Sequence, residues 1–317
     1  MIVQKEMGDH ITSWRYIILL AIIALTCLAS LYTASQTIRD AVDQANDKSN
    51  LEGLFLFLKL FTVSGDSGLP SFVWFVTFLG PLLGIALGFD AINSERSKGT
   101  LSRMMSQPVP RDYVINAKFV AALAVISVLF FALGFLVMGF GIYIYGIPPS
   151  FESFLRVIFF IILTIIYVAF WLNLSILFSV RFRQAATSAL SSIAVWLFFT
   201  VFYQMIIRLV SQATAPGQQS VKTINALMNH QHLIFFLGRL SPSQLFNDGT
   251  TTLLTPSVRS LGPLMRQQVV GAIPSPLPLG QSLLLVWPQV TGLIAATVVC
   301  FGISYLLFMR QEIRSRS

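Results

Sequence analysis

The sequence contains few charged residues. Only 11% of its 317 residues are charged, whereas a typical soluble domain carries about a quarter. Hydrophobic residues make up 55% of the chain, and 27 residues are Phe. The apolar residues fall into six blocks, each near the roughly 20 residues that a helix needs to cross a bilayer. This pattern excludes a soluble globular protein and predicts a multi-pass integral membrane protein.

Several chemical signatures are also missing. The two cysteines, Cys27 and Cys300, lie inside apolar blocks, so we expect packing residues and no disulfide framework. The net charge of +8 comes without a basic run interleaved with aromatics, which argues against a nucleic-acid partner. No Gly-x(4)-Gly-Lys-Ser/Thr phosphate loop occurs, so the chain has no ATPase motif. Without paired carboxylates, a His-Glu-x-x-His motif or a Ser/Lys dyad in any block, we predict no catalytic, cofactor or metal site.

The blocks predict an all-α integral membrane domain over residues 1–317 with six transmembrane helices. The spans are expected at about 16–32, 72–89, 119–145, 154–180, 189–207 and 290–309. The first has the positively charged lead of a signal peptide, but it is longer than a usual signal core, and we interpret it as a retained anchor. The hydrophilic segment 208–280, between spans five and six, is expected to be partly helical.

The distribution of basic residues predicts the orientation. If the N-terminus is cytoplasmic, the cytoplasmic segments hold 12 basic and 6 acidic residues of the chain's 21 and 13, which leaves 9 and 7 for the other side. The positive-inside rule therefore places both termini and the region 90–118 in the cytoplasm, and segments 33–70 and 208–280 outside. The near absence of charge within the spans argues against a proton- or sodium-coupled carrier and favours a hydrophobic or amphipathic substrate.

The region 90–118 is the longest charged, turn-rich break between apolar blocks. Gly99 can end a first short helix in the left-handed conformation, and Thr100 can cap a second one. Pro108 and Pro110 would end the second helix. One face of that helix would carry Leu101, Met104 and Met105, with Arg103 on another face. An amphipathic knob of this kind is suited to docking on a partner protein.

The order of residues here resembles the signature of ABC-2 type transporter permeases. The matching residues are Glu95, Gly99, Thr100 and Leu101 in a Glu-x(3)-Gly-Thr-Leu element, followed by Pro108, Arg111 and Lys118. One departure is Ala117, where the family often has glycine. Within the family, the local sequence around Gly88-Phe89-Asp90 most resembles the branch that includes the membrane subunit of the nitrous-oxide-reductase maturation transporter. We do not expect the copper-related role of that branch in this chain, because the sequence has no Met- or Cys-rich cluster that could bind copper.

The resemblance implies a permease subunit that works with a separate ATPase. We expect two copies of the permease and two of the ATPase, with ATP and Mg²⁺ bound by that partner, in the plasma (inner) membrane of a bacterium or archaeon. An exporter is the first expectation. The alternative is a mechanotransmitter that moves no substrate and acts on an extracytoplasmic partner protein through segment 208–280.

The same resemblance implies which residues couple the permease to its ATPase. They are Glu95, Arg96, Gly99, Thr100, Leu101, Arg103, Met104, Met105, Pro108 and Arg111. Glu95 and Arg96 would make charge-assisted contacts with the ATPase, and the apolar side chains would fill its groove. For Arg111 and Lys118, binding of lipid phosphates is the alternative.

Other polar residues outside this region have more ordinary interpretations. Asn173, deep in the fourth span, is expected to form a hydrogen bond at a helix interface, and the alternative is a position in a transport pathway. Arg156 is expected to extend to the membrane interface. The pair His230 and His232 would point apart on a helix without a third metal ligand. Segment 51–61 is amphipathic and is expected to rest on the membrane surface.

Overall fold

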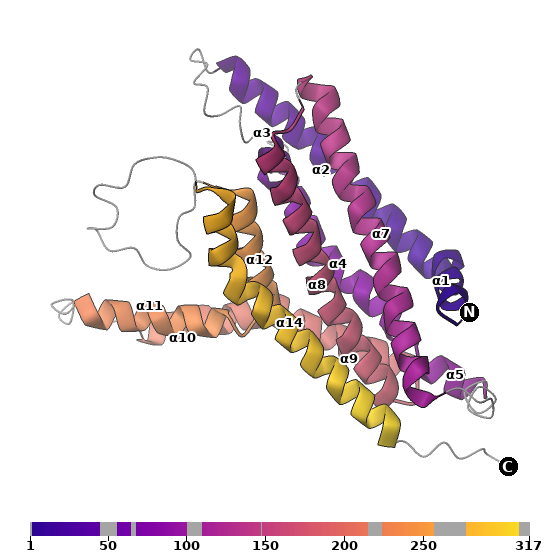
Figure 1. Ribbon diagram of the computed structural model, residues 1–317. Helices are drawn as coiled ribbons and strands as arrows, with labels where there is room; N and C mark the ends of the chain where they lie inside the picture. The colour runs from indigo at the N-terminus through magenta and orange to yellow at the C-terminus, as the bar shows by residue number, and fades with distance from the viewer. Residues whose placement is uncertain are drawn as a thin grey trace.

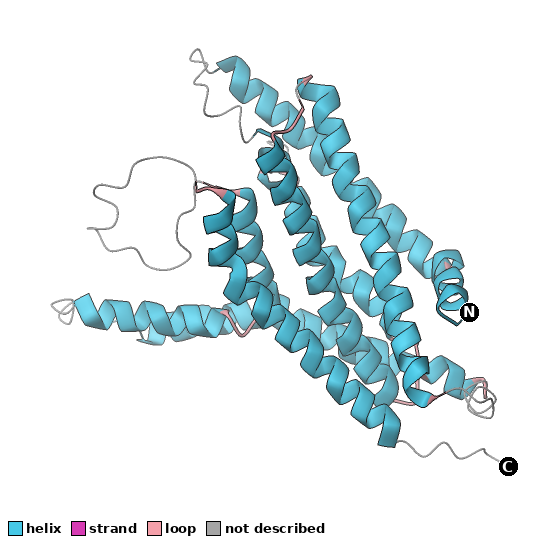
Figure 2. Ribbon diagram, viewed as in Figure 1, coloured by secondary structure: helices cyan, strands magenta, loops and turns pink. Residues whose placement is uncertain are grey.

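A computed structural model of the chain describes residues 2–44, 56–64, 68–99, 110–146, 148–214, 224–256 and 277–310. These residues form helices and turns, and no strand occurs among them (Figure 2). Six helical stretches are long and apolar enough to cross a membrane. The predicted all-α class and the number of spans are both confirmed.

Apart from α4, the spanning helices are longer than the apolar blocks that predicted them. The bounds of the helices are α1 Ile2–Thr12, α2 Trp14–Gln44, α3 Leu56–Thr62, α4 Phe72–Gly88, α5 Asn93–Ser97, α7 Arg111–Tyr145, α8 Phe151–Arg181, α9 Ala185–Leu197, the π-helical turn η2 Phe198–Phe202, α10 Tyr203–Thr214, α11 Ile224–Gly238, α12 Pro242–Leu254 and α14 Leu279–Arg310. The fifth span runs through α9, η2 and α10. The longer helices continue past the apolar block at one or both ends because helix formation requires only that backbone groups be paired, whereas the apolar block marks the part suited to lipid.

Local sequence explains several helix ends. The hydroxyl of Ser71 accepts a hydrogen bond from the amide of Trp74 at the start of α4, and Ser150 accepts one from Ser153 at the start of α8. Both serines satisfy amides that have no partner within the helix. Gly146 follows α7 with a φ of +67°, the left-handed conformation that glycine adopts without a steric penalty.

Helix α8 is the centre of the bundle, and its most extensive contacts are with α4 and α14. On α4, Gly80, Gly84 and Gly88 form a stripe at four-residue spacing that faces α8. A Cβ atom at Gly84 would lie 2.7 Å from the carbonyl oxygen of Val168, so only glycine allows this approach. Small residues at this spacing let membrane helices pack backbone to backbone.

Helix α3 lies inside the protein, where it contacts α2, α4, α7 and α8. The side chains of Leu58, Leu60 and Phe61 are almost fully buried, and the ring of Phe61 packs edge-on against Phe72 of α4. The expectation of a helix resting on the membrane surface is therefore wrong for residues 56–61. The apolar face is covered by neighbouring helices, which accounts for the pattern equally well.

Helix α12 also lies within the bundle, packed against α8 and α14. The Tyr167 hydroxyl, midway along α8, lies 3.2 Å from the Ser243 hydroxyl in the first turn of α12. The ring of Phe246 stacks on that of Tyr167, with centroids 4.4 Å apart. The α12 helix thus starts level with the middle of α8 and runs toward the end of the bundle where α8 begins.

Arg156 joins the far end of α12 to α8 and α14. Its side chain is fully buried, and it donates hydrogen bonds to the carbonyl oxygens of Leu253 and Leu277 and to the hydroxyl of Ser282. Glu152, one turn earlier, neutralises its charge at 2.8 Å. The expectation that Arg156 extends to the membrane interface is wrong, because carbonyls at the end of a buried helix provide the arginine with ligands.

Figure 1 shows how these elements are arranged. Helix α1, helix α5 and the C-terminal end of α14 lie toward one end of the bundle, and the turn between α7 and α8 lies at the other. Helices α10 and α11 lie side by side and project from the bundle. The end that carries α1 and α5 is called the α5 end below.

Candidate functional site

The α5 end brings together three helices that are distant in the sequence. Helix α1 packs along the start of α7, and α5 follows the last turn of α4. Each of the three contributes one charged side chain to a common point: Glu6 from α1, Glu95 from α5 and Lys118 from α7. We call these three residues the Lys118 cluster.

Lys118 is the centre of this cluster. Its ammonium group lies 3.0 Å from both carboxylate oxygens of Glu6 and 2.8 Å from Oε1 of Glu95. The Lys118 side chain is 6% exposed, against 11% for Glu6 and 17% for Glu95. A buried lysine requires such partners, because an unpaired charge away from water is costly. The cluster therefore fixes α1 and α5 to the base of α7.

A second set of bonds fixes α5 to α8. The Ser179 hydroxyl, in the last turn of α8, accepts hydrogen bonds from the amides of Ile92 and Asn93 at 2.9 and 3.2 Å. These amides stand at the start of α5, where they have no partner within that helix. A displacement of α5 would thus be passed directly to α7 through Lys118 and to α8 through Ser179.

Arg15 closes the side of this junction at the start of α2. Its guanidinium group forms an ion pair with Asp90 and lies over the ring of Phe89, 5.1 Å from the centroid. Between α1, α4, α5 and α7 lies a cavity of about 470 Å³. Charged side chains of both signs line it, namely Lys5, Glu6, Asp9, Arg15, Asp90, Glu95, Lys98 and Lys118. Such a cavity is suited to charged side chains of a partner protein.

His10 of α1 also lines this cavity. Burial lowers the pKa of His10 from its usual value of 6.5, and the positive charge of Lys118 lowers it further, while the carboxylates of Glu6, Asp90 and Asp9 act in the opposite direction. The neutral imidazole is therefore favoured at the junction between α1 and the bundle.

The described part of the structure includes only some of the residues predicted to couple the permease to its ATPase. Gly99 has a φ of +69°, the conformation expected of a residue that ends a helix. Lys98 is exposed, whereas Arg96 and Glu95 are both half-buried, and the Glu95 carboxylate points to Lys118. Helix α7 begins at Arg111. Outside the described residues lie Thr100, Leu101, Arg103, Met104, Met105 and Pro108.

One predicted role changes with this geometry, and one residue gains a role that was not predicted. Lys118 is enclosed by two carboxylates, so its alternative role as a ligand of lipid phosphates does not fit. Glu6 had no predicted role, and nothing in the sequence links it to a lysine 112 positions later. The only signal was the position of Lys118 in the family pattern, which marked the lysine without naming its partners.

Asn173 and the two histidines lie elsewhere. Asn173 is fully buried, and its Nδ2 lies 3.5 Å from the carbonyl oxygen of Thr297 on α14, the geometry of a contact between helices. His230 faces α10, where its ring nitrogen lies 3.0 Å from the carbonyl oxygen of Ser211, while His232 is exposed. Among the described residues, no three metal-binding side chains meet in a group that could hold a metal ion.

Comparison with known proteins identifies the family. The family model described as "ABC-2 family transporter protein" matches residues 1–313, nearly the whole chain. No curated protein matches the chain. The match is to the family as a whole and does not support the narrower nitrous-oxide-reductase maturation branch suggested by Gly88-Phe89-Asp90. The six apolar spans agree with a multi-pass membrane protein.

Proposed function

Since the chain belongs to the ABC-2 transporter family, whose members are membrane permease subunits, we propose that it forms an exporter with a separate ATPase. Two copies of the permease would assemble with two of the ATPase in the plasma membrane of a bacterium or archaeon. ATP and Mg²⁺ would be held by the ATPase. The α5 end would face the cytoplasm, in keeping with the excess of basic residues there.

The observation that carries this proposal is the Lys118 cluster. A docking region must pass a displacement into the spans, and a rigid link between the two is therefore required. Glu95 of α5 is bound to α7 through Lys118 at 2.8 Å, and the start of α5 is bound to α8 through Ser179. An ATPase that moves residues 94–106 would then shift α1, α7 and α8 together.

This geometry divides the work between Glu95 and Arg96. Glu95 is turned inward to Lys118, so its main role is to transmit the motion within the permease. Arg96, with the exposed Lys98 beside it, contacts the ATPase directly. The apolar side chains of Leu101, Met104 and Met105 would fill the groove of the partner, and Arg103 and Arg111 would add charged contacts to it.

The test measures ATPase stimulation and ATPase binding separately, with the complex reconstituted in nanodiscs. Arg96→Ala should weaken ATPase binding, whereas Glu95→Gln should leave the complex assembled and abolish most of the stimulation. Lys59→Ala, which removes an exposed lysine from α3, is the matched control and should change neither. Full stimulation in a folded Glu95→Gln and Arg96→Ala double variant would contradict the proposal.

A specific observation also favours the second candidate, the mechanotransmitter. Helices α10 and α11 project from the bundle (Figure 1), and Leu233, Phe236 and Leu240 are exposed on or next to α11. An extracytoplasmic partner could bind to this projection and be moved by it. ATP-dependent uptake of a candidate substrate into inverted vesicles supports export. Capture of a partner that is lost when α11 is altered, without any such uptake, supports transmission.

A further inference from the structure

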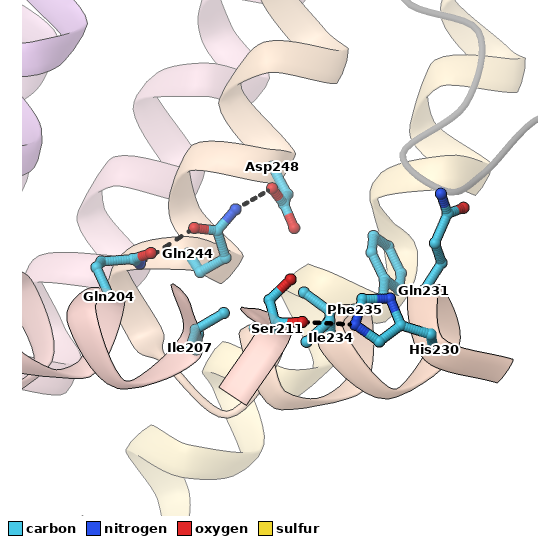
Figure 3. Close-up of a pocket in the computed structure, with 10 residues that line it drawn as sticks. Gln204, Ile207, Ser211, His230, Gln231, Ile234, Phe235, Gln244 and Asp248 are labelled. Carbon is cyan, nitrogen blue, oxygen red and sulfur yellow. Dashed lines mark hydrogen bonds between the residues drawn. The ribbon is translucent and has the colours of Figure 1, made fainter. Parts of the chain in front are cut away.

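A cavity of about 540 Å³ lies between α10, α11 and α12, away from the Lys118 cluster (Figure 3). Its lining combines polar and apolar side chains. Among the described residues that line it, Asp248 of α12 is the only one with a carboxylate side chain. A half-buried carboxylate facing a cavity selects for positive charge.

The Asp248 carboxylate is held in place by a chain of amides. Gln244 donates to its Oδ1 at 2.7 Å, and Gln204 of α10 donates to Gln244 at 3.3 Å. In Figure 3 the second carboxylate oxygen points into the cavity, toward Ser211 and His230, and no hydrogen bond is drawn to it. One oxygen is thus fixed by the protein while the other faces the space that a ligand would occupy.

Arg239, just after the end of α11, does not occupy this space. It acts on the Asp248 charge from a distance, but its guanidinium group lies over the ring of Phe235, 4.3 Å from the centroid, and it does not line the cavity. The imidazole of His230 is engaged with the carbonyl oxygen of Ser211. The cavity therefore presents an acceptor for a cation from outside.

The apolar side chains that line the cavity are Ile207 of α10 and Ile234 and Phe235 of α11. The outer faces of the same two helices are apolar and exposed, as at Met205, Leu209 and Phe236. In a membrane these faces are suited to contact with lipid tails. A ligand with an apolar body could reach the cavity from the bilayer as well as from water.

The position of α12 strengthens the requirement for a positive charge. Because Ser243 is level with Tyr167 in the middle of α8, Asp248 lies a little more than one turn farther along, still beside a spanning helix. An ionised carboxylate in such a place is costly unless a cation neutralises it, and ionisable groups within membrane domains mark ligand sites for that reason.

We propose that this cavity binds a lipophilic organic cation, with the positive charge beside Asp248 and the apolar body against Ile207, Ile234 and Phe235. The inference concerns binding by this chain alone. It does not depend on an ATPase or on the direction of transport, so its failure and the failure of the proposed function are distinguishable.

The experiment measures binding to the purified chain in a nonionic detergent by equilibrium dialysis. The probes are tetraphenylphosphonium and tetraphenylborate, which have the same shape and opposite charge. We expect the cation to bind at least about tenfold more tightly than the anion, and Asp248→Asn to weaken cation binding by about tenfold or more, a change of roughly 1.4 kcal/mol. Asp40→Asn, which neutralises an exposed carboxylate near the end of α2, should leave binding unchanged.

Two results would overturn the inference. One is equal binding of the two probes to the wild-type chain, which needs no variant and so does not depend on how Asp248→Asn folds. The other would come from a photoreactive azide of tetraphenylphosphonium, whose labelling site on the chain is mapped by mass spectrometry. The inference requires label on residues 203–214, 224–238 or 242–254, and label confined to other helices would refute it.

Discussion

A single lysine, Lys118, joins three helices at the α5 end, and its removal should be costly. Lys118→Met leaves the carboxylates of Glu6 and Glu95 without their cation in a site where all three side chains are under 20% exposed. Breaking a buried ion pair by deleting one partner typically costs about 3–5 kcal/mol. We therefore expect a loss of several degrees in the thermal unfolding midpoint, measured by tryptophan fluorescence in detergent.

The cause of the stability loss in Lys118→Met can be tested by also removing the two carboxylates that the lysine neutralises. Because much of the loss comes from unpaired carboxylates, the triple variant Glu6→Gln, Lys118→Met, Glu95→Gln should unfold at a higher temperature than Lys118→Met alone. If the triple variant is no more stable than the single one, the charges of the cluster do not account for the loss.

The lowered pKa of His10 predicts how the stability of this junction depends on pH. Its pKa is lowered in the folded chain, with burial as the largest cause, so the neutral ring is favoured by folding. Its contribution is fully present above the usual value of 6.5 and is lost as the pH falls through the lower, folded pKa. We expect the unfolding midpoint of the wild type, relative to that of His10→Gln, to decrease between about pH 7.5 and pH 5. A relative midpoint that rises on acidification would contradict this assignment.

Residue-level roles were only partly predictable. The turn at Gly99 follows from local chemistry, because a residue without Cβ ends a helix at low cost. The partners of Lys118 and Arg156 depend on contacts across 112 and 121 positions, about which local composition contains no information. Arg156 also shows that position near the end of a span does not distinguish an arginine that extends to the interface from one that satisfies buried carbonyls.

At the scale of elements, the α4–α8 contact depends on the absence of side chains. Gly84→Ala would place a Cβ atom 2.7 Å from the carbonyl oxygen of Val168 and 3.0 Å from the amide nitrogen of Leu172. Both atoms belong to the backbone of α8 and cannot rotate away, so the helices must separate. We expect a loss of about 1–3 kcal/mol, seen as a lower unfolding midpoint in detergent.

Gly139 of α7 provides the matched control. A Cβ atom there would meet nothing within 4 Å, so Gly139→Ala should be neutral or slightly stabilising, because alanine favours the helix over glycine. An equal loss in both variants would show that the close approach of α4 and α8 is not the cause of the loss in Gly84→Ala.

The elements themselves were largely predictable, and their surroundings were not. Long apolar runs predict spans because unpaired backbone groups cannot be exposed to lipid, so the chain there must be helical. The same runs do not show which face is covered by protein. Segment 56–61 and α12 both have apolar faces that could meet lipid, and the structure buries them against α8 and its neighbours. The glycine stripe on α4 was visible in the sequence and would have predicted the contact, though not its partner.

At the scale of the whole molecule, the burial of the spans is uneven. About 67% of the most apolar window of the span Phe151–Arg181 is buried within the chain, compared with 6% for Ala185–Thr214 and 17% for Leu279–Arg310. The central helix α8 therefore holds the bundle together, while α9, η2 and α10 present an apolar face to lipid or to the second permease copy that we propose. The cavity beside Asp248 lies behind that face, where a change in the packing of α10 would alter it.

The orientation of the bundle can be tested by chemical labelling. In a background with Cys27→Ala and Cys300→Ala, the exposed positions Lys98, after α5, and Phe151, at the start of α8, are separately changed to cysteine. They are separated by the span Asp112–Ile144, so they face opposite sides of the membrane. A membrane-impermeant maleimide added to intact cells should label Phe151→Cys at once and Lys98→Cys only after permeabilisation. The reverse pattern would place the Lys118 cluster outside the cell, beyond the reach of a cytoplasmic ATPase.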